Sequence, residues 1–220
     1  YALARYGKAA TKILDAYDRY EFQTISHTIN HLLTVDLSAF YIDISKDSLY
    51  TRAANSTERR STQTVIYTIT DGLTRLLAPI LPITTDDLWN FLPGTREASV
   101  HIAEFPTNCK ALVDHELLDR WERLESLRET VNLVLEKLRN EKIVGTSLEA
   151  AVHIQANGQT QELIERYKDE LPTLFITSEV TIESTNGLPT SADVAQTAGV
   201  EFSENGGSAF VTARRSSGIK

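Results

Sequence analysis

The spacing of apolar residues changes once along this chain, and that change limits the possible folds more than any other feature. Up to Gly145, apolar residues recur every three or four positions, which is the period of amphipathic helices. Beyond it, Leu148, Ala150, Val152 and Ile154 alternate with Glu149, Ala151, His153 and Gln155, as in a half-buried strand. We therefore predict a mainly α fold, with a helical bundle at 1–145 followed by a small α+β domain at 146–220.

The first domain is expected to contain a series of helices separated by short breaks. They are expected at about 3–20, 22–47, 57–78, 84–92 and 114–143. Ser56 is suited to cap the third helix, because its side chain can accept a hydrogen bond from a first-turn amide. The APILP segment (78–82) ends that helix because its prolines lack amide donors, and Thr84 or Thr85 is expected to cap the next. A short extended piece is expected at 100–103.

The third helix has two chemically different faces. At 100° per residue, one side collects the apolar residues Val65, Ile69, Leu73 and Leu76. Roughly opposite lie the more polar residues Arg60, Gln63, Tyr67 and Thr74. We expect the first face to pack in the core and the second to meet water or a partner.

The second domain is expected to follow the long helix at about 114–143, which connects the two halves and ends before Gly145. A helix is predicted at 160–171. Further strands are predicted near 180–183, 200–202 and 209–213, with turns at Asn186–Gly187 and 204–207.

Composition excludes several classes of protein. Among 220 residues, 41% are hydrophobic and no apolar run approaches 18 residues, so we expect no membrane span. Cys109 is the single cysteine, which excludes a disulfide framework and fits a reducing cytoplasm. The net charge of -8 argues weakly against a nucleic-acid partner, but the charge is unevenly distributed. Acidic residues are concentrated at 97–129, whereas 50–70 has three arginines against one glutamate.

No catalytic or metal centre is predicted. His27 and His31 lie four residues apart, a spacing that zinc can use, but no third ligand follows nearby. Two partly exposed helix histidines are therefore the preferred interpretation. The chain also lacks a phosphate-binding glycine loop and a nucleophile–base arrangement.

One stretch, from Thr34 to Thr64 and into the helix that follows, mixes basic, aromatic and apolar residues more densely than any other. Its cations, Lys46, Arg52, Arg59 and Arg60, could contact phosphates, and Tyr50 or Tyr67 could stack on an unpaired base. The other interpretation is that these are ordinary surface charges paired with Asp47 and Glu58, with half-buried tyrosines. Composition alone favours that second interpretation.

Several segments carry a family resemblance. The segments DLSAFYIDISKDSLY, NSTERRSTQTV, APILP, TTDDLW and VLEKLRNEKIVGTSLEAAVHI occur in this order between residues 34 and 154. Together they resemble the part of bacterial-type isoleucyl-tRNA synthetases that lies downstream of the catalytic domain. The first two are more specific to the isoleucine enzyme than to its valine and leucine relatives.

The resemblance implies a helix-bundle anticodon-binding domain followed by a small α+β junction domain. It implies ATP-dependent aminoacylation for the full enzyme, with ATP and Mg²⁺ used by a catalytic domain expected upstream of Tyr1. A four-cysteine zinc module is expected after Lys220, and none of these cofactors is expected on this chain. The implied partners are the anticodon stem-loop of an isoleucine tRNA and the rest of the synthetase, and we expect a monomer.

The resemblance also reverses the preference for ordinary surface charges. The residues predicted to bind tRNA are Lys46, Tyr50, Arg52, Arg59, Arg60, Gln63 and Tyr67, with Arg214 and Arg215 as further candidates. Asp36 and Tyr41 match the same motif but are expected to pack, with Asp36 bonded to an arginine or to a neighbouring backbone. Two alternatives stay open: a valine- or leucine-type anticodon domain, and a helical protein-interaction module that does not bind RNA.

Overall fold

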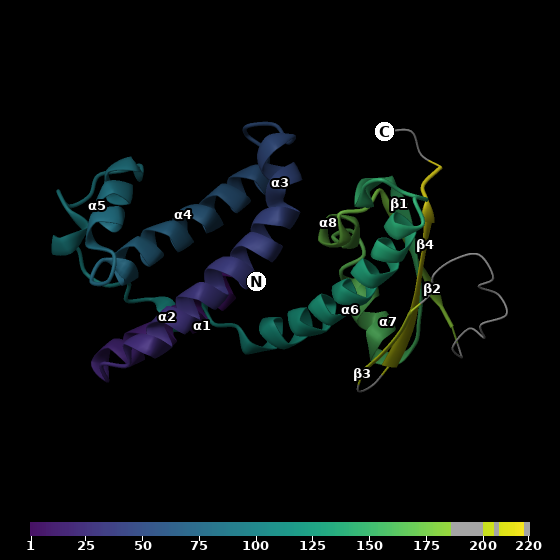
Figure 1. Cartoon of the computed structure of the whole chain (residues 1–220), viewed down its shortest axis with the longest axis horizontal. Helices are drawn as coiled ribbons and strands as arrows, with labels where there is room; N and C mark the ends of the chain where they lie inside the picture. The colour runs from purple at the N-terminus through teal and green to yellow at the C-terminus, as the bar shows by residue number, and fades with distance from the viewer. Residues whose placement is uncertain (186–199, 205–206, 218–220) are drawn as a thin grey trace. The chain divides into compact units, whose positions relative to one another are not determined.

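The computed structural model describes residues 1–185, 200–204 and 207–217, which divide into two compact units, Tyr1–Leu118 and Asp119–Lys220. The first unit is helical and the second combines helices with one sheet, so the predicted fold class is confirmed (Figure 1). The division falls inside the predicted connecting helix rather than after residue 145.

The first unit is built from helices of very different lengths. They are α1 (Ala2–Asp18), α2 (Phe22–His31), η1 (Leu32–Ile42), α3 (Asp43–Tyr50), α4 (Thr57–Leu77), α5 (Pro82–Phe91) and the 3₁₀ turns η2 (Val100–Ile102) and η3 (Cys109–Leu112). Helix α1 lies at its centre and packs against α2, η1, α4 and η3. Small buried residues such as Ala10 and Ala16 let these neighbours approach closely, and Tyr6 and Ile13 fill the space between them.

The predicted second helix is present as one continuous helix of three segments, α2, η1 and α3. Its middle segment, η1, is a π-helix, in which hydrogen bonds join residues five apart. Leu32 and Leu37, five apart, are both buried, whereas Leu33 is 37% exposed. The wider helical turn thus moves Leu33 out of the apolar stripe that an α-helical spacing predicts.

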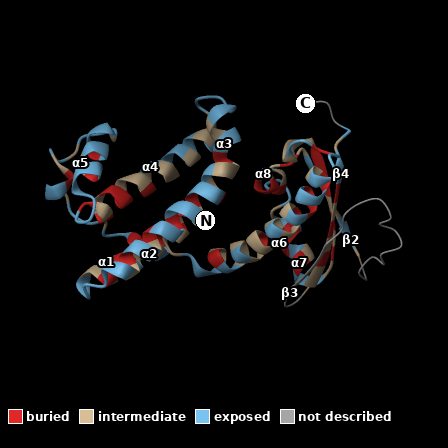
Figure 2. Ribbon diagram, viewed as in Figure 1, coloured by how far each residue is buried: buried red, intermediate tan, exposed pale blue. Residues whose placement is uncertain are grey.

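Helix α4 begins at Thr57 and is capped by Ser56 as predicted: the Ser56 Oγ accepts a hydrogen bond from the Arg59 amide at 3.2 Å. Its second half is largely buried and its first half largely exposed (Figure 2). The position predicted for Thr74 was wrong. Its side chain is 1% exposed and its hydroxyl donates to the Thr70 carbonyl oxygen at 2.7 Å, so burial costs it no hydrogen bond.

The segment after α4 differs in two details from the sequence prediction. Helix α5 begins at Pro82, where the missing amide costs nothing in a first helical turn, instead of at Thr84 or Thr85. The predicted extended piece at 100–103 contains instead the 3₁₀ turn η2, capped by Ser99.

Trp89 fixes α5 against α4. Trp89 is 1% exposed, and two guanidinium groups stack on its ring, those of Arg75 at 4.7 Å and Arg96 at 4.5 Å from the ring centroid. Its indole Nε1 donates to the Glu97 carbonyl oxygen at 2.8 Å. Asp71 joins the two arginines, at 2.9 Å from Arg75 Nε and 3.3 Å from Arg96 Nη1.

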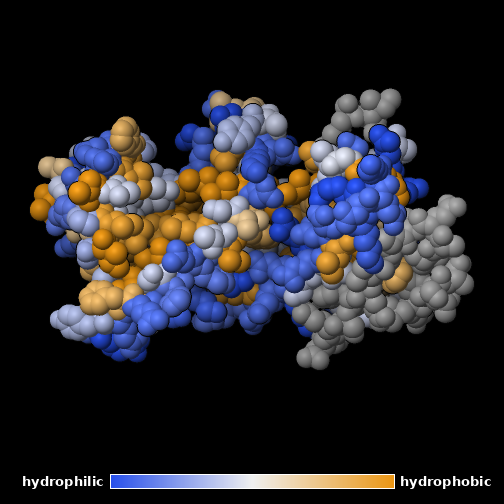
Figure 3. Space-filling view, viewed as in Figure 1, coloured by the Kyte–Doolittle hydropathy of each residue, from blue (hydrophilic) through white to orange (hydrophobic). Residues whose placement is uncertain are grey.

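An apolar groove of about 330 Å³ runs between η1, α4 and α5. Leu33, Ile66, Leu77 and Leu88 are among the side chains that line it. Hydrophobic side chains also gather on the surface over α4 and α5 (Figure 3).

The second unit contains a four-stranded sheet. Helix α6 (His115–Asn140) belongs to this unit from Asp119 onward. The elements that follow it are η4 (Ser147–Glu149), β1 (Ala150–Ala156), α7 (Gly158–Arg166), α8 (Leu171–Phe175), β2 (Glu179–Ser184), β3 (Val200–Glu204) and β4 (Gly207–Arg215). The strand order is β2-β1-β4-β3, in which β1 pairs parallel with β2 and antiparallel with β4. The predicted turn at Asn186–Gly187 and residues 205–206 of the second turn lie outside the described residues.

The two faces of this sheet have different surroundings. On one face of β1, Ala150, Val152, Ile154 and Ala156 are all buried. Helices α6, α7 and α8 lie on one side of the sheet, and Arg128 Nε of α6 donates to the Leu174 carbonyl oxygen of α8 at 2.9 Å (Figure 1). His153 and Gln155 point to the other face, which is more exposed. Within the described residues, no helix has the length and apolar character needed to cross a membrane.

Candidate nucleic-acid interface

The corner between α3 and α4 gathers the first group of predicted residues. Helix α3 packs against the start of α4, and the loop 51–56 joins them. Tyr41 packs inside this corner: it is half-buried, and the hydroxyls of Ser45 and Thr62 lie close to its own. Burial raises the pKa of the Tyr41 phenol, so the hydroxyl stays protonated. The packing role predicted for Tyr41 is therefore present.

Lys46 and Tyr50 lie one turn apart on the exposed side of α3. The Lys46 ammonium lies 2.7 Å from Asp43 Oδ1, and this hydrogen bond and charge raise the pKa of Lys46. The Tyr50 side chain is 82% exposed. Tyr50 thus offers an open ring for stacking, whereas Lys46 would have to share its charge with a neighbouring carboxylate.

Arg59 stabilises the corner through a backbone hydrogen bond rather than offering its charge to a partner. Its Nη1 donates to the Arg52 carbonyl oxygen at 3.1 Å, and its Nε is buried. The Arg52 side chain itself is exposed. Of the two arginines, Arg52 is therefore the one whose charge is available, and Arg59 holds the loop that carries it.

Arg60, Gln63 and Tyr67 form an exposed row along α4. Their spacing of three and four residues puts them on one face of the helix. The Tyr67 hydroxyl donates to the Pro93 carbonyl oxygen at 3.4 Å and accepts from Arg96 Nη2 at 3.2 Å. Arg60 and Gln63 keep their polar ends toward solvent, and Tyr67 exposes 40% of its surface.

Asp36 takes the arginine partner that the sequence predicts. Its Oδ1 lies 3.6 Å from Arg5 Nε, and its Oδ2 lies 3.4 Å from His31 Nδ1. The pair His27 and His31 belongs to no group of three potential metal ligands in the part of the chain that the structure describes.

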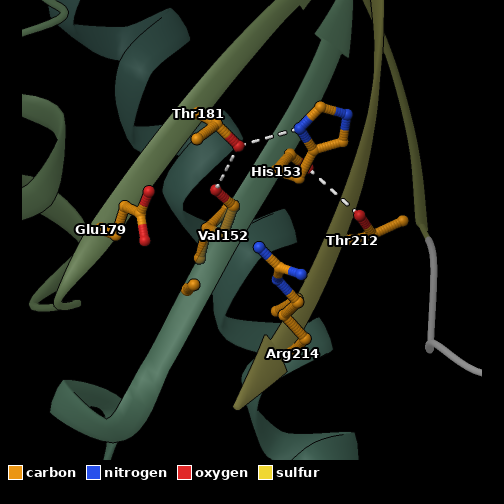
Figure 4. A pocket seen from close by; sticks show the side chains of 8 residues that line it. Val152, His153, Glu179, Thr181, Thr212 and Arg214 are labelled. Carbon is orange, nitrogen blue, oxygen red and sulfur yellow. Dashed lines mark hydrogen bonds between the residues drawn. The ribbon is translucent and has the colours of Figure 1, made fainter. Parts of the chain in front are cut away.

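Arg214 and Arg215 lie near the end of β4, in the second unit, and point to opposite faces of the sheet. Arg214 lines an open pocket of about 330 Å³ together with His153, Glu179 and Thr181 (Figure 4). Arg215 Nη2 lies 3.9 Å from Glu149. The structure does not bring the two arginines together in one pocket.

The polar side chains beside Arg214 largely satisfy one another. His153 Nδ1 lies 2.9 Å from Thr181 Oγ1 (Figure 4). Its Nε2 lies 3.2 Å from Glu183 Oε2. Hydrogen bonds from Gln155 and His153 lower the pKa of Glu183. The polar atoms of His153 are thus already engaged.

Sequence interpretation missed a further group of basic residues, Arg5, Lys8 and Lys12 on α1, which line a groove beside α2. Their spacing of three and four residues was a usable signal. It was overlooked because the apolar stripe of the same segment already explained why it is helical.

Exposed basic and aromatic side chains are the two kinds of group that proteins binding unpaired RNA need, for phosphate contacts and for base stacking. Residues 1–154 match the family described as the anticodon-binding domain of tRNA ligase, and the chain belongs to this family.

The relatives that it matches include isoleucine–tRNA ligases. It is 42% identical over 181 residues to the enzyme of Syntrophotalea carbinolica, covering 82% of this chain and 20% of that protein. It is 40% identical over 192 residues to the enzyme of Bacillus subtilis, covering 87% and 21%, and 38% identical over 185 residues to that of Bacillus cytotoxicus, covering 84% and 20%. The chain thus spans about a fifth of their length. These matches favour the isoleucine type over the valine or leucine type and over an interaction module without RNA.

Proposed function

We propose that this chain binds the anticodon stem-loop of an isoleucine tRNA and does so as part of an isoleucine–tRNA ligase. The observation that carries this proposal is the family match over residues 1–154, on a bundle whose α3–α4 corner exposes Tyr50, Arg52, Arg60 and Gln63. The whole ligase would use ATP and Mg²⁺ to join isoleucine to this tRNA in the cytoplasm. It would act as a monomer, and zinc would bind in a module other than this chain.

The corner can supply both kinds of contact that RNA recognition requires. Arg52 and Arg60 would take phosphates, and the amide of Gln63 can bond to the edge of an unpaired base. Tyr50 would stack under a base, a contact worth about 1–3 kcal/mol. Arg59 would act indirectly, by holding the loop that carries Arg52. Lys46, Tyr67, Arg214 and Arg215 complete the proposed set. RNA would have to displace or share the present partners of Lys46, Tyr67 and Arg215.

Titration of the chain with an isoleucine anticodon stem-loop, at two salt concentrations, tests this proposal. Tyr50→Ala should weaken binding roughly tenfold or more, since stacking is lost. Arg52→Ala with Arg60→Ala should weaken binding further and reduce the salt dependence, because each lost phosphate contact lowers the salt slope by about one. Lys110→Ala, a change at an exposed lysine on η3, is the matched control.

A stem-loop with a scrambled anticodon completes the experiment. Tighter binding of the matched loop, lost in the corner variants, is the expected result. Equal binding of both loops, unchanged by the corner variants, would refute anticodon recognition at this corner. Binding that does not respond to salt would instead favour a protein-interaction module.

A further inference from the structure

A second charged surface of the first unit lies in the groove between α1 and α2, about 390 Å³ in volume. Basic side chains line both of its walls: Arg5, Lys8 and Lys12 from α1, and His27 and His31 from α2. Thr28 and Leu32 also line this groove. It has no residue in common with the α3–α4 corner.

Helix geometry aligns the basic residues of each wall. On an α-helix, positions 5, 8 and 12 fall within about 60° of one another, so their side chains leave α1 in one direction. His27 and His31 are one turn apart on α2. Because α1 and α2 pack against each other, both rows border the same groove.

The groove keeps positive charge that no carboxylate neutralises. Asp36, whose side chain is 11% exposed, engages Arg5 and His31 at one end. Lys8 and Lys12 are exposed, and neither makes an ion pair with any residue that the structure describes. On a chain of net charge -8, two ammonium groups in one groove create a local site for an anion.

We infer that this groove binds phosphates of the RNA backbone, a site additional to the anticodon-binding corner, and the inference rests on the proposed function. Lysines on flexible stems act as point charges for phosphate and need no fixed base geometry. The His27 side chain, which makes no hydrogen bond with a described residue, can add an imidazole N–H donor. The groove would hold the RNA without reading its sequence.

The continuous helix α2–η1–α3 connects the groove to the corner. From His27 to Tyr50 it covers 23 residue steps, or at most about 35 Å at the α-helical rise of 1.5 Å per residue. RNA that reaches both places therefore extends beyond the anticodon loop, so the groove would contact a different part of the same tRNA.

The test uses a full-length isoleucine tRNA transcript and the chain with Lys8→Ala and Lys12→Ala. Both residues are exposed on a helix and alanine favours helices, so folding should be unaffected, which thermal unfolding checks. We expect the salt slope to fall by about two and affinity in 0.1 M salt to drop roughly ten- to a hundredfold. The drop should be equal for matched and scrambled anticodons, because phosphate contacts carry no sequence information.

Lys110→Ala with Lys137→Ala removes the same charge elsewhere and should change the slope less. If the groove variant matches this control while Tyr50→Ala still weakens binding, the groove inference is overturned and the proposed function stands. A third outcome is that the wild-type chain binds matched and scrambled anticodons equally while the groove variant binds both more weakly. The groove inference would then stand, and anticodon recognition would be refuted. If the wild-type chain does not bind the transcript at all, both the groove inference and the proposed function are overturned. If the groove variant loses binding to an acidic peptide but keeps its binding to the transcript, the groove would instead be a site for a protein partner.

Discussion

The two halves of α4 carry opposite kinds of side chain on one uninterrupted helix. From Ile69 onward the helix is mostly buried against Tyr6 and α5, and Gly72, Leu73 and Leu76 are in its core face. From Thr57 to Tyr67 it is mostly exposed, and its conspicuous residues are basic or polar (Figure 2). Because the half from Ile69 onward holds the helix in the core, the half from Thr57 to Tyr67 need not pack and can contact a partner.

The anchored half should respond most strongly at Trp89, which fastens α5 to it. Trp89→Ala removes a fully buried ring and its stacking with Arg75 and Arg96, and should cost about 3–5 kcal/mol of unfolding free energy. Urea unfolding followed by far-ultraviolet circular dichroism measures this. Phe91→Ala, on the same helix but 85% exposed, is the control and should cost little.

Gly72 should show the next largest effect. An alanine Cβ there would overlap the Tyr6 hydroxyl and lie 2.6 Å from its Cζ, so Gly72→Ala should cost about 1–3 kcal/mol despite the better helix propensity of alanine. Trp89 is one of two tryptophans, so its fluorescence reports on this unit in a Trp121→Phe background. Thr64→Ala, at an exposed position of α4, should be neutral or stabilising. If Gly72→Ala and Thr64→Ala lower the unfolding free energy equally, the two halves of α4 do not differ in their contribution to stability.

The cap at the start of α4 should matter less. Ser56→Ala leaves the Arg59 amide without its side-chain acceptor and should cost about 1 kcal/mol. Ser61→Ala, inside the same exposed half, is the matched control, and chemical denaturation of both variants gives the difference. A cost near that of Trp89→Ala would mean that the exposed half is also essential for stability.

Substitution of Arg60 should affect RNA binding but not the unfolding free energy. Because its side chain is exposed, Arg60→Ala should change the unfolding free energy by less than about 0.5 kcal/mol. The same variant should weaken binding of the anticodon stem-loop and lower its salt slope by about one. A destabilised Arg60→Ala protein would show that this half also anchors the helix.

Local chemistry made part of this structure predictable. Ser56 was predicted to cap α4, the apolar stripe predicted that Ile69, Leu73 and Leu76 pack in the core, and the change of period near Gly145 predicted strand β1. The division of α4 into an exposed and a buried half was not predicted. What depends on distant contacts was not predictable. Strand β1 pairs with β2 and β4, which are far along the chain, and the arginine that Asp36 meets is Arg5, 31 positions away, which the sequence did not single out.

The candidate site follows the same rule. Periodicity correctly left Arg60, Gln63 and Tyr67 on an exposed face. It could not show that Arg59 supports the backbone of Arg52, because that hydrogen bond depends on how the loop folds back. The groove beside α2 went unnoticed since its two walls come from separate helices, and only their packing brings the charges together.

The π-helical segment η1 has a consequence for how this domain tolerates changes in chain length. A π turn closes over one residue more than an α turn, so η1 carries surplus residues relative to an ordinary helix. Deleting a single residue elsewhere, for example in α4, would turn every later side chain by about 100°. Within η1 the same deletion can remove a surplus residue and leave both flanking helices in register. Insertions and deletions accepted during evolution should therefore concentrate here, between the groove and the corner.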